Sequence, residues 1–220
     1  WNTPAGITYG TLLSDVQLNA TSGIAGTFSY LPVAGTLLEA GDEQELIVNF
    51  TPADANNYKG GSAKVKISVA KADAIIKVYG YSGVYNGLAH GATGTAKGIN
   101  NQELGGLDLG ASFTDAPGGV AYWTFDGGKN YNSTSGSVNI EIAKATPTIT
   151  LTVGTNPTYS GLAHYVEAAT VTGVNNTSLG SALVVYKQGS TIVPNPINAG
   201  TYSVTASFAG NTNYEAAQEK

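Results

Sequence analysis

The chain has 220 residues, of which 42% are hydrophobic and 11% charged, and all ten basic residues are lysines against 15 acids. A net charge of -5 argues against nucleic acid as a partner, since nucleic-acid-binding proteins concentrate Lys and Arg on one face. Cysteine is absent, which excludes disulfides and thiolate metal sites, and no apolar run approaches the ~18 residues of a membrane span, so we expect no membrane insertion.

Recurring dipeptides and tripeptides indicate three copies of one unit. Ala-Lys-Ala closes a predicted strand at 70–72 and again at 143–145, and Asn-Tyr occurs at 57–58, 130–131 and 213–214. Because these landmarks keep the same order, chance composition does not explain them. We therefore predict domains at residues 1–71, 72–145 and 146–220.

A tyrosine followed by glycine within two residues stands near the start of each unit. These tyrosines are Tyr9, Tyr85 and Tyr159, and Gly-Leu-Ala-His follows in units two and three at 87–90 and 161–164. The shared segments make units two and three the most similar pair.

The predicted strands have a period of two. Residues 63–69 alternate branched aliphatic side chains with lysines and a serine, and 137–142 and 202–208 repeat the alternation. Such a pattern predicts strands with one buried and one wet face, in an antiparallel arrangement. Turn-forming residues at 51–57 and 125–130 separate the strands, and no stretch has the periodicity of an amphipathic helix.

The linkers and the ends bear on how the units are arranged. Linkers 71–72 and 144–145 are short and lack glycine, so we expect stiff joints and an elongated array. Unit one lacks most of the strand that begins unit two at Ile75, and unit three stops at Lys220, just before its counterpart of 65–69. We therefore expect a slice of a longer array, with unit one missing most of its first strand and unit three its last.

Residues 198–204, Asn-Ala-Gly-Thr-Tyr-Ser-Val, resemble the approach to strand F of an immunoglobulin-type sandwich. Tyr202 stands in the place of the corner tyrosine and Val204 in the place of the second cysteine. With the Asn-Tyr landmarks, the chain resembles the bacterial Ig-like tandem repeats (MBG-type) of secreted, adhesin-like surface proteins. Segments 41–44 and 117–120 depart from the pattern, since neither carries the corner tyrosine.

The resemblance implies an all-β fold of three tandem immunoglobulin-like β-sandwich repeats in an elongated array. It also implies an extracellular, cell-surface location and no catalytic residues. We therefore predict a non-catalytic structural or adhesive stalk segment of a bacterial surface protein, whose partners are neighbouring repeats of the same or another chain. Two alternatives stay open: a fibre subunit assembling by inter-chain strand complementation, and a carbohydrate-binding module that recognises a glycan or another cell-surface ligand.

Candidates for catalysis are few. His90 and His164 are the two histidines, at equivalent places in units two and three, and no Gly-x-Ser-x-Gly elbow accompanies them. Equivalence between repeats favours a structural turn. The acids that could form a glycosidase pair are scattered, with one cluster predicted to lie in a turn; they are Asp42, Glu43, Glu45, Asp108, Asp115 and Asp126. We predict no catalytic, cofactor-binding or metal-binding residue and leave ligand-binding residues unassigned.

Three further chemistries are weighed against plain structural roles. Calcium could be held by Asp54 with 56–57 or by Asp126 with Asn130, although turn capping explains the same residues, so no cofactor is predicted. A sugar-stacking platform is set against cross-strand packing for the aromatic residues Trp1, Tyr30, Tyr79, Tyr81, Tyr122 and Trp123. A Lys–Asn cross-link requires a buried lysine, for which the candidates are Lys66, Lys77 and Lys187.

Overall fold

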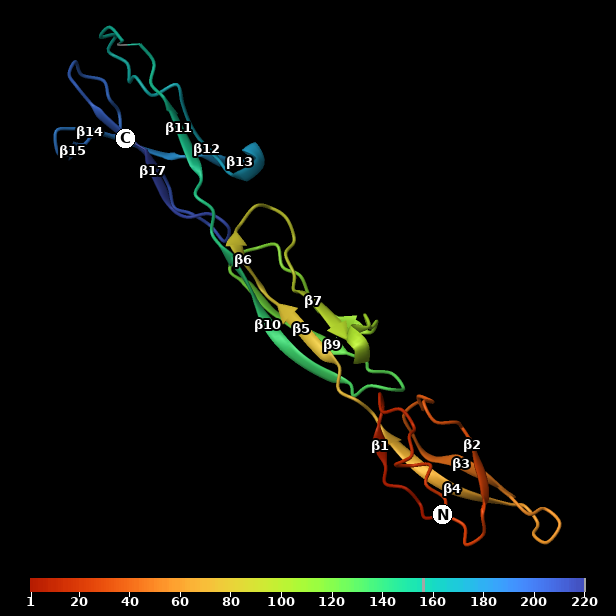
Figure 1. Cartoon of the computed structure of the whole chain (residues 1–220). Coiled ribbons are helices and arrows are strands. Elements are labelled where there is room, and N and C mark those ends of the chain that lie inside the picture. The colour runs from red at the N-terminus through yellow and green to blue at the C-terminus, as the bar shows by residue number, and fades with distance from the viewer. Residues whose placement is uncertain (156, 220) are drawn as a thin grey trace. The chain divides into compact units, whose positions relative to one another are not determined.

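A computed structural model describes residues 1–155 and 157–219 of the chain (Figure 1). Strands make up 48% of the structure, about twice the 20–25% of an ordinary globular domain. The described residues contain no α-helix, and their helical turns are two short 3-10 segments. The prediction of an all-β chain is confirmed, and none of these helical segments is long and apolar enough to cross a bilayer.

Residues 1–71 contribute one four-stranded sheet. Its strands are β1 (Ile7–Thr8), β2 (Gly26–Leu31), β3 (Gly41–Pro52) and β4 (Gly61–Ala70). They are ordered β1-β4-β3-β2, with β2, β3 and β4 antiparallel.

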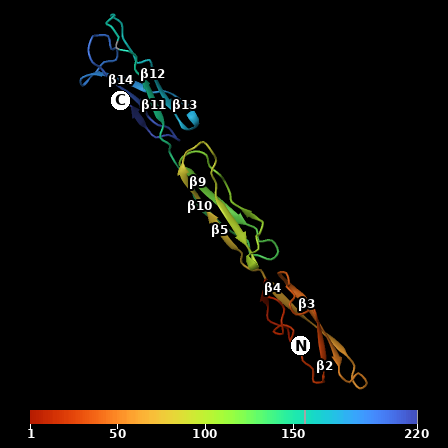
Figure 2. The ribbon, with the colours of Figure 1, turned by 45° about the horizontal axis from the view of Figure 1, so that its top comes forward.

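Residues 72–145 contribute a four-stranded sheet, ordered β6-β10-β9-β8, and a two-stranded one, β5-β7. The elements are β5 (Ile75–Tyr79), β6 (Tyr81–Val84), β7 (Thr93–Lys97), the 3-10 turn η1 (Ile99–Asn101), β8 (Leu107–Asp108), β9 (Gly118–Phe125) and β10 (Thr134–Ala143). Figure 2 shows the same strands from a turned view.

Residues 146–219 contribute sheets ordered β11-β12-β13 and β15-β14-β16-β17. The elements are β11 (Thr148–Thr152), β12 (Ala168–Thr172), η2 (Val174–Asn176), β13 (Ser178–Ser181), β14 (Leu183–Gln188), β15 (Thr191–Ile192), β16 (Ser203–Phe208) and β17 (Ala217–Glu219). Short β17 pairs with β16 and begins the strand that the sequence led us to expect to be missing from this repeat. Asn156 and the terminal Lys220 lie outside the described residues.

Two strand pairs correct the expectation of antiparallel strands throughout. β1 runs parallel to β4, and β6 runs parallel to β10. The registers correspond, since Ile7 lies opposite Val69 and Gly83 opposite Ile142. In both of these repeats an early strand crosses over to join the last one, so the two share a direction.

The predicted repeat correspondences extend to backbone conformation. η1 and η2 begin after Gly98 and Gly173, and both contain an asparagine in the left-handed region. Asn100 has φ 54° and ψ 27°, and Asn175 has φ 54° and ψ 29°. Asparagine tolerates this region better than most side chains, which explains its presence in both turns.

Burial confirms the alternation predicted for two strands. In β4, Ile67 and Val69 are buried between exposed neighbours, and in β10, Ile140 and Ile142 follow the same rule. β16 departs from the pattern because its residues from Val204 onward are buried or half-buried on both faces.

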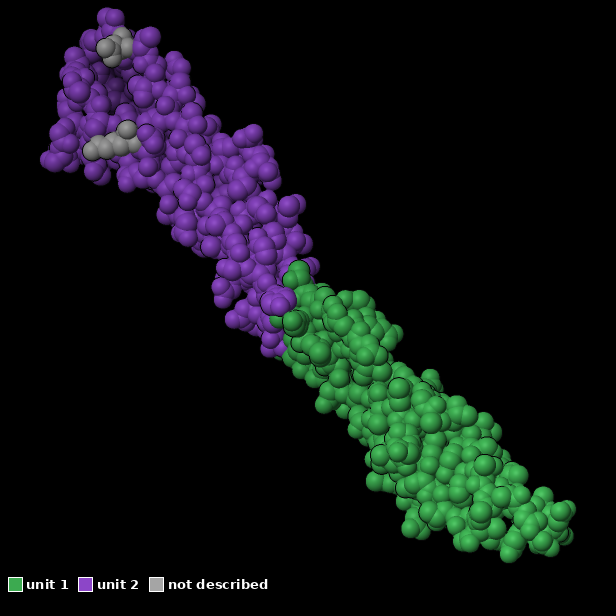
Figure 3. All heavy atoms as spheres, viewed as in Figure 1, with its two compact units in different colours: residues 1–78, 93–109, 122–136 green, residues 79–92, 110–121, 137–220 purple. Residues whose placement is uncertain are grey.

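The chain divides into two compact units, coloured green and purple in Figure 3. The first comprises residues 1–78, 93–109 and 122–136, and the second comprises 79–92, 110–121 and 137–220. Linker 71–72 lies inside the first unit and linker 144–145 inside the second. The three sequence-based domains stay a prediction.

Each unit has its own core. The first holds two apolar clusters, one around Leu46 and Ile67 and the other around Phe125 and Tyr131. The second holds one around Ile140 and Ile142, and further buried residues at Val171, Tyr186, Ala206 and Tyr214. Tyr131 and Tyr214, the tyrosines of two Asn-Tyr landmarks, are therefore core residues.

Candidate functional site

Each unit contains one arrangement, called a joint here, in which the linker alanine meets the Asn-Tyr landmark with the same contacts. The linker alanine forms a one-residue parallel bridge with the landmark tyrosine: Ala72 with Tyr131 and Ala145 with Tyr214. Ala72 N donates to the carbonyl oxygen of Asn130 at 3.0 Å, and Ala145 N donates to that of Asn213 at 2.9 Å. Both alanines are buried, so the linker is part of the packed structure.

The landmark asparagine side chain bonds to a distant, earlier segment of the chain. Asn130 Oδ1 accepts from the backbone N–H of Ala40 at 2.9 Å, and Asn213 Oδ1 accepts from that of Ala116 at 2.9 Å. Asn213 Nδ2 also donates to Asp115 Oδ1 at 2.8 Å. Because Ala40 and Ala116 are buried, losing the asparagine would leave each of these N–H groups without a partner, which costs free energy.

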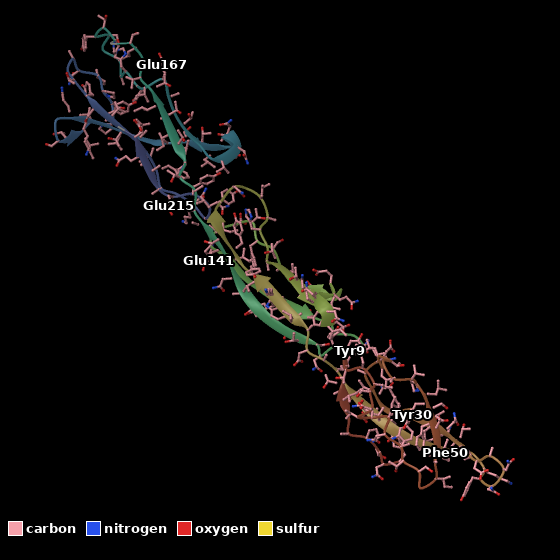
Figure 4. All side chains as sticks on the ribbon, viewed as in Figure 1. Tyr9, Tyr30, Phe50, Glu141, Glu167 and Glu215 are labelled. Carbon is pink, nitrogen blue, oxygen red and sulfur yellow. The ribbon has the colours of Figure 1, made fainter. Side chains whose placement is uncertain are left out.

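A pair of tyrosines packs edge to face in each joint. The rings of Tyr9 and Tyr131 have centroids 5.4 Å apart at 81°, and those of Tyr85 and Tyr214 are 5.5 Å apart at 76°. Such pairs favour T-shaped geometry because the positive ring edge meets the negative ring face. Figure 4 labels Tyr9 in the first joint and Glu215, the residue after Tyr214, in the second.

The hydroxyl of each buried tyrosine accepts a hydrogen bond from the first residue of a 3-10 turn, η1 or η2. Tyr131 Oη accepts from Ile99 N and Tyr214 Oη from Val174 N, both at 3.0 Å. A Cβ on Gly98 would collide with Tyr131 Oη. Glycine at this position therefore makes room for the hydroxyl.

Lysine contacts complete the two joints. Lys71 Nζ donates to the Gly128 carbonyl at 2.5 Å, and Lys144 Nζ donates to the Asn211 carbonyl at 2.6 Å. The first joint adds an exposed ion pair between Lys129 and Glu39. Exposed ion pairs contribute little, so the contacts of the half-buried asparagine and the buried tyrosine dominate.

The two histidines lie in equivalent turns. His90 Nε2 is 2.9 Å from Asn86 Oδ1, and the His90 ring stacks on Tyr81 at 3.9 Å. His164 Nε2 is 3.0 Å from Ser160 Oγ, which occupies the place of Asn86. In residues 1–155 and 157–219, neither histidine is hydrogen-bonded to a carboxylate. The contacts close a turn in both repeats.

The acidic cluster corrects one expectation. Asp42, Glu43 and Glu45 lie at the start of β3, not in a turn. The register of β3 against β4 shifts between Gly41 and Gln44, and Glu43 has φ 57°, so a β-bulge produces the irregular spacing that looked like a turn.

Two lysines of β4 pair with this acidic cluster. Glu45 accepts from Lys64 at 2.9 Å, and Glu43 pairs with Lys66. The hydrogen bond to Glu43, and then its charge, raise the pKa of Lys66 above its ordinary value.

The remaining acids occupy separate places. Asp108 ends β8, Asp115 belongs to the second joint, and Asp126 Oδ1 accepts from Gly128 N at 2.9 Å. Asp115 and Asp126 accept from Asn213 and Gly128, so neither forms a carboxylate pair with the β3 acids.

The residues weighed for calcium serve as turn caps. Asp54 accepts hydrogen bonds from the backbone of Asn56 and Asn57 and from the Asn57 side chain at 2.7 Å. The Asn57 side chain, followed by its backbone, lowers the pKa of Asp54. The side-chain oxygen of Asn130 already accepts a hydrogen bond from the backbone N–H of Ala40. Within the described residues, no group of three or more His, Asp or Glu side chains could hold a metal ion.

The aromatic candidates divide into packed and exposed residues. Tyr122 and Trp123 face opposite sides of β9, because Trp123 packs on the core while Tyr122 is 72% exposed. Trp1 packs edge to face on Tyr30 at 5.4 Å, whereas Tyr79 is exposed. The lysines weighed for a cross-link are all exposed, which removes the required burial; they are Lys66, Lys77 and Lys187.

Sequence reasoning found the landmarks but missed their contacts. It singled out Asn-Tyr and Ala-Lys-Ala without assigning the asparagine a partner, and it did not identify Ala40 or Ala116. A usable signal was present: Ala116 precedes Phe125 by nine residues, and Ala199 precedes Phe208 by nine. In the first repeat Ala40 precedes Phe50 by ten residues, because the bulge in β3 adds one residue. The shared spacing is therefore hidden there.

The chain was compared with protein-family models, curated proteins and solved structures, and none of them matches it.

Proposed function

We propose that this chain is a non-catalytic structural segment of an extracellular bacterial surface protein, a stalk in which immunoglobulin-like repeats hold an adhesive or assembling part at a distance. The observation that carries the proposal is the joint, which the chain builds twice from the same residue types in the same geometry. A linker alanine, an asparagine, and a pair of tyrosines recur with hydrogen bonds that agree within 0.1 Å.

The joint suits a mechanical role because it removes freedom between repeats. A flexible connection needs a solvated spacer, whereas here the linker alanine is buried and bridged. The asparagine amide fixes both direction and register, since its oxygen reaches one particular backbone N–H.

Tyr202 supports the immunoglobulin-like part of the proposal. Its hydroxyl donates to the carbonyl oxygen of Asn198, four residues upstream, at 2.8 Å. A corner tyrosine in an immunoglobulin-type sandwich makes this kind of bond, two residues before the position of the second cysteine. Val204 stands at that position here.

Residual dipolar couplings test the stiffness of the first joint. Residues 1–71 and residues 72–78, 93–109 and 122–136 belong to one compact unit, and we expect their amide couplings to fit a single alignment tensor. Asn130→Ala should separate the two sets into different tensors, and Tyr122→Ala, an exposed position, should not. Two tensors in the wild-type chain would contradict the proposal.

The location is tested on intact source cells. Protease added outside should release peptides of this chain while a cytosolic marker stays whole. Protection of the chain until the cells are broken would contradict a surface location.

A further inference from the structure

Asn86 is the only asparagine of the sequence that is directly followed by glycine. It lies in the turn after β6, where Asn86 is half-buried and Gly87 is exposed. Gly87 has φ 80°, and, apart from its chain neighbours, the nearest described atom to an added Cβ would be Asn175 Nδ2 at 3.8 Å. The backbone nitrogen of Gly87 is therefore sterically open, and its N–H has no hydrogen-bond partner within residues 1–155 and 157–219.

Two hydrogen-bond donors converge on the side-chain oxygen of Asn86. Leu88 N–H donates to Asn86 Oδ1 at 2.9 Å, and His90 Nε2 lies 2.9 Å from the same atom. The bond from Leu88 identifies which end of the amide is the oxygen, because a backbone N–H requires an acceptor. An amide oxygen only accepts, so His90 Nε2 carries a hydrogen and donates it to Oδ1.

The His90 donor is held in position by two further contacts. The backbones of His90 and Phe113 exchange a pair of N–H to carbonyl bonds, both at 2.8 Å. The His90 ring stacks on Tyr81, with centroids 3.9 Å apart and planes 9° apart. The turn therefore aims a fixed donor at the amide oxygen, the arrangement that stabilises a negative charge forming on that oxygen.

We propose that Asn86 is a modification site at which the chain deamidates itself, leaving aspartate at position 86. The Gly87 nitrogen attacks Cγ of Asn86, an intramolecular step between neighbouring groups, and a cyclic succinimide forms as the bond from Cγ to Nδ2 breaks. The proton of the Gly87 nitrogen leaves with the amide group as ammonia. Water then opens the ring: its hydroxyl adds to Cγ, its remaining hydrogen returns to the Gly87 nitrogen, and the bond between them breaks.

The donors on Oδ1 act in both steps. Negative charge develops on Oδ1 whenever Cγ is attacked, first by the Gly87 nitrogen and then by water, and the N–H groups of Leu88 and His90 stabilise it. Attack of water at the backbone carbonyl carbon of residue 86 would give isoaspartate instead. The oxygen of that carbonyl accepts from Asn175 Nδ2 at 3.3 Å, a longer bond. Aspartate is therefore the expected main product.

The equivalent turn of the third repeat has the same contacts without a reactive amide. Ser160 precedes Gly161, and its Oγ atom lies 3.0 Å from His164 Nε2 and accepts from Leu162 N–H at 3.3 Å. A serine side chain has no ammonia to release. Asn86→Ser therefore copies a turn that the chain already contains and serves as the matched control.

The turn should accommodate aspartate without loss of stability. A carboxylate accepts from both donors as the amide oxygen does, and hydrogen bonds to an ionised acceptor are stronger. Asn86→Asp should accordingly melt at the wild-type temperature or above it. A lower melting temperature would mean that the turn does not hold the product, contrary to the inference.

Ageing of the full chain in buffer near neutral pH, followed by peptide mapping with mass spectrometry, tests the proposal. The peptide with Asn86 should exchange NH2 for OH well before the peptide with Asn132, which a serine follows. Synthetic peptides of both isomers serve as standards, and aspartate should exceed isoaspartate. In Asn86→Ser the same peptide should stay unchanged.

His90→Phe tests the donor separately. Phenylalanine keeps a ring that can stack on Tyr81 but donates no hydrogen bond, so loss of the Asn86 amide should slow by about tenfold or more. Circular dichroism checks that the variant is folded. The product ratio in the wild type requires no variant, so it tests the same donors if His90→Phe does not fold.

Three results would overturn the inference: an Asn86 amide no more labile than that of Asn132, an unchanged rate in folded His90→Phe, and isoaspartate as the main product. The chemistry is local to one turn and needs neither a surface location nor stiff joints. It can therefore fail while the proposed function stands, and the reverse holds as well.

Discussion

Single atoms decide how the tyrosines of the joints are accommodated. Tyr131 Oη lies where a Cβ on Gly98 would be, and Tyr214 Oη lies in the same relation to Gly173. Gly98 has φ -94° and ψ -162°, an extended conformation open to any residue, so the need for glycine there is steric. Each hydroxyl also accepts a hydrogen bond from a backbone N–H of the neighbouring 3-10 segment.

Gly98→Ala should therefore destabilise the fold. The new methyl group displaces Tyr131 and lengthens its bond to Ile99, and overpacking of this kind costs about 1–3 kcal/mol in unfolding free energy. Urea denaturation measures the loss. Gly105→Ala is the matched control, because a Cβ there meets nothing within 4 Å. Equal losses in the two variants would show that the hydroxyl needs no such space.

Asn57→Ala should raise the pKa of Asp54 toward its ordinary value of 3.8. In the folded chain the Asn57 side chain and backbone lower the pKa of Asp54, so the ionised carboxylate stabilises the fold above pH 3.8. This stabilisation is lost as the pH falls through the lowered pKa of the folded state. NMR titration of the Asp54 carboxyl measures the change. Asn56→Ala should leave it nearly unmoved, since only the Asn56 backbone contributes. An unchanged pKa in Asn57→Ala would assign the lowering to another group.

At the scale of elements, the alternating strands could be predicted and the crossing strands could not. Ile67 and Ile140 are buried as the period of two predicted, because a pleated strand sends successive side chains to opposite faces. The parallel pairing of β1 with β4 depends on a crossover between distant segments, which a local pattern does not encode. The β-bulge at Glu43 escaped prediction because the sequence shows no glycine at the left-handed position.

The sequence predicted which landmark residues matter in the joint, but it did not predict the hydrogen bonds that they form. Repetition marked Asn213 and Tyr214 as important, but the partner of Asn213 is a backbone N–H on Ala116, and an alanine carries no side-chain signal of that role. The same holds for Ala40 in the first joint. Only the folded chain brings segments about 90 residues apart together.

Asn213→Ala should weaken the second joint. It leaves the buried Ala116 N–H without its acceptor and removes the bond to Asp115, and an unpaired buried donor costs about 1–3 kcal/mol. Thermal and urea unfolding measure the loss. Thr212 is an exposed neighbour in the same turn, and its side chain has no hydrogen bond to any residue that the structure describes, so Thr212→Ala should change stability by less than about 0.5 kcal/mol. Comparable losses in the two variants would contradict the role given to the asparagine.

At the scale of the whole molecule, the chain consists of two compact units, each containing one linker and one joint. The joints therefore belong to the cores, since Tyr131 and Tyr214 are buried core residues of their units. This organisation links the mechanical role proposed for the chain to the same contacts that stabilise its fold.

Damage to one joint should stay within its unit. Native-state hydrogen exchange of Asn213→Ala should show faster exchange in residues 79–92, 110–121 and 137–219, and unchanged exchange in residues 1–71, because distant sites contribute independently to stability. Uniformly faster exchange along the chain would mean that the two units unfold as one.

The most direct measurement compares three equivalent amides in one dilute sample of the wild-type chain. Ala40 N–H and Ala116 N–H are bonded to Asn130 and Asn213, and Ala199 N–H has no partner among the described residues. We expect hydrogen exchange by NMR to find Ala40 and Ala116 protected at least a hundredfold more than Ala199. Exchange of all three amides at similar rates would contradict the claim that Asn130 and Asn213 each hold a buried backbone N–H in a joint that the chain builds twice.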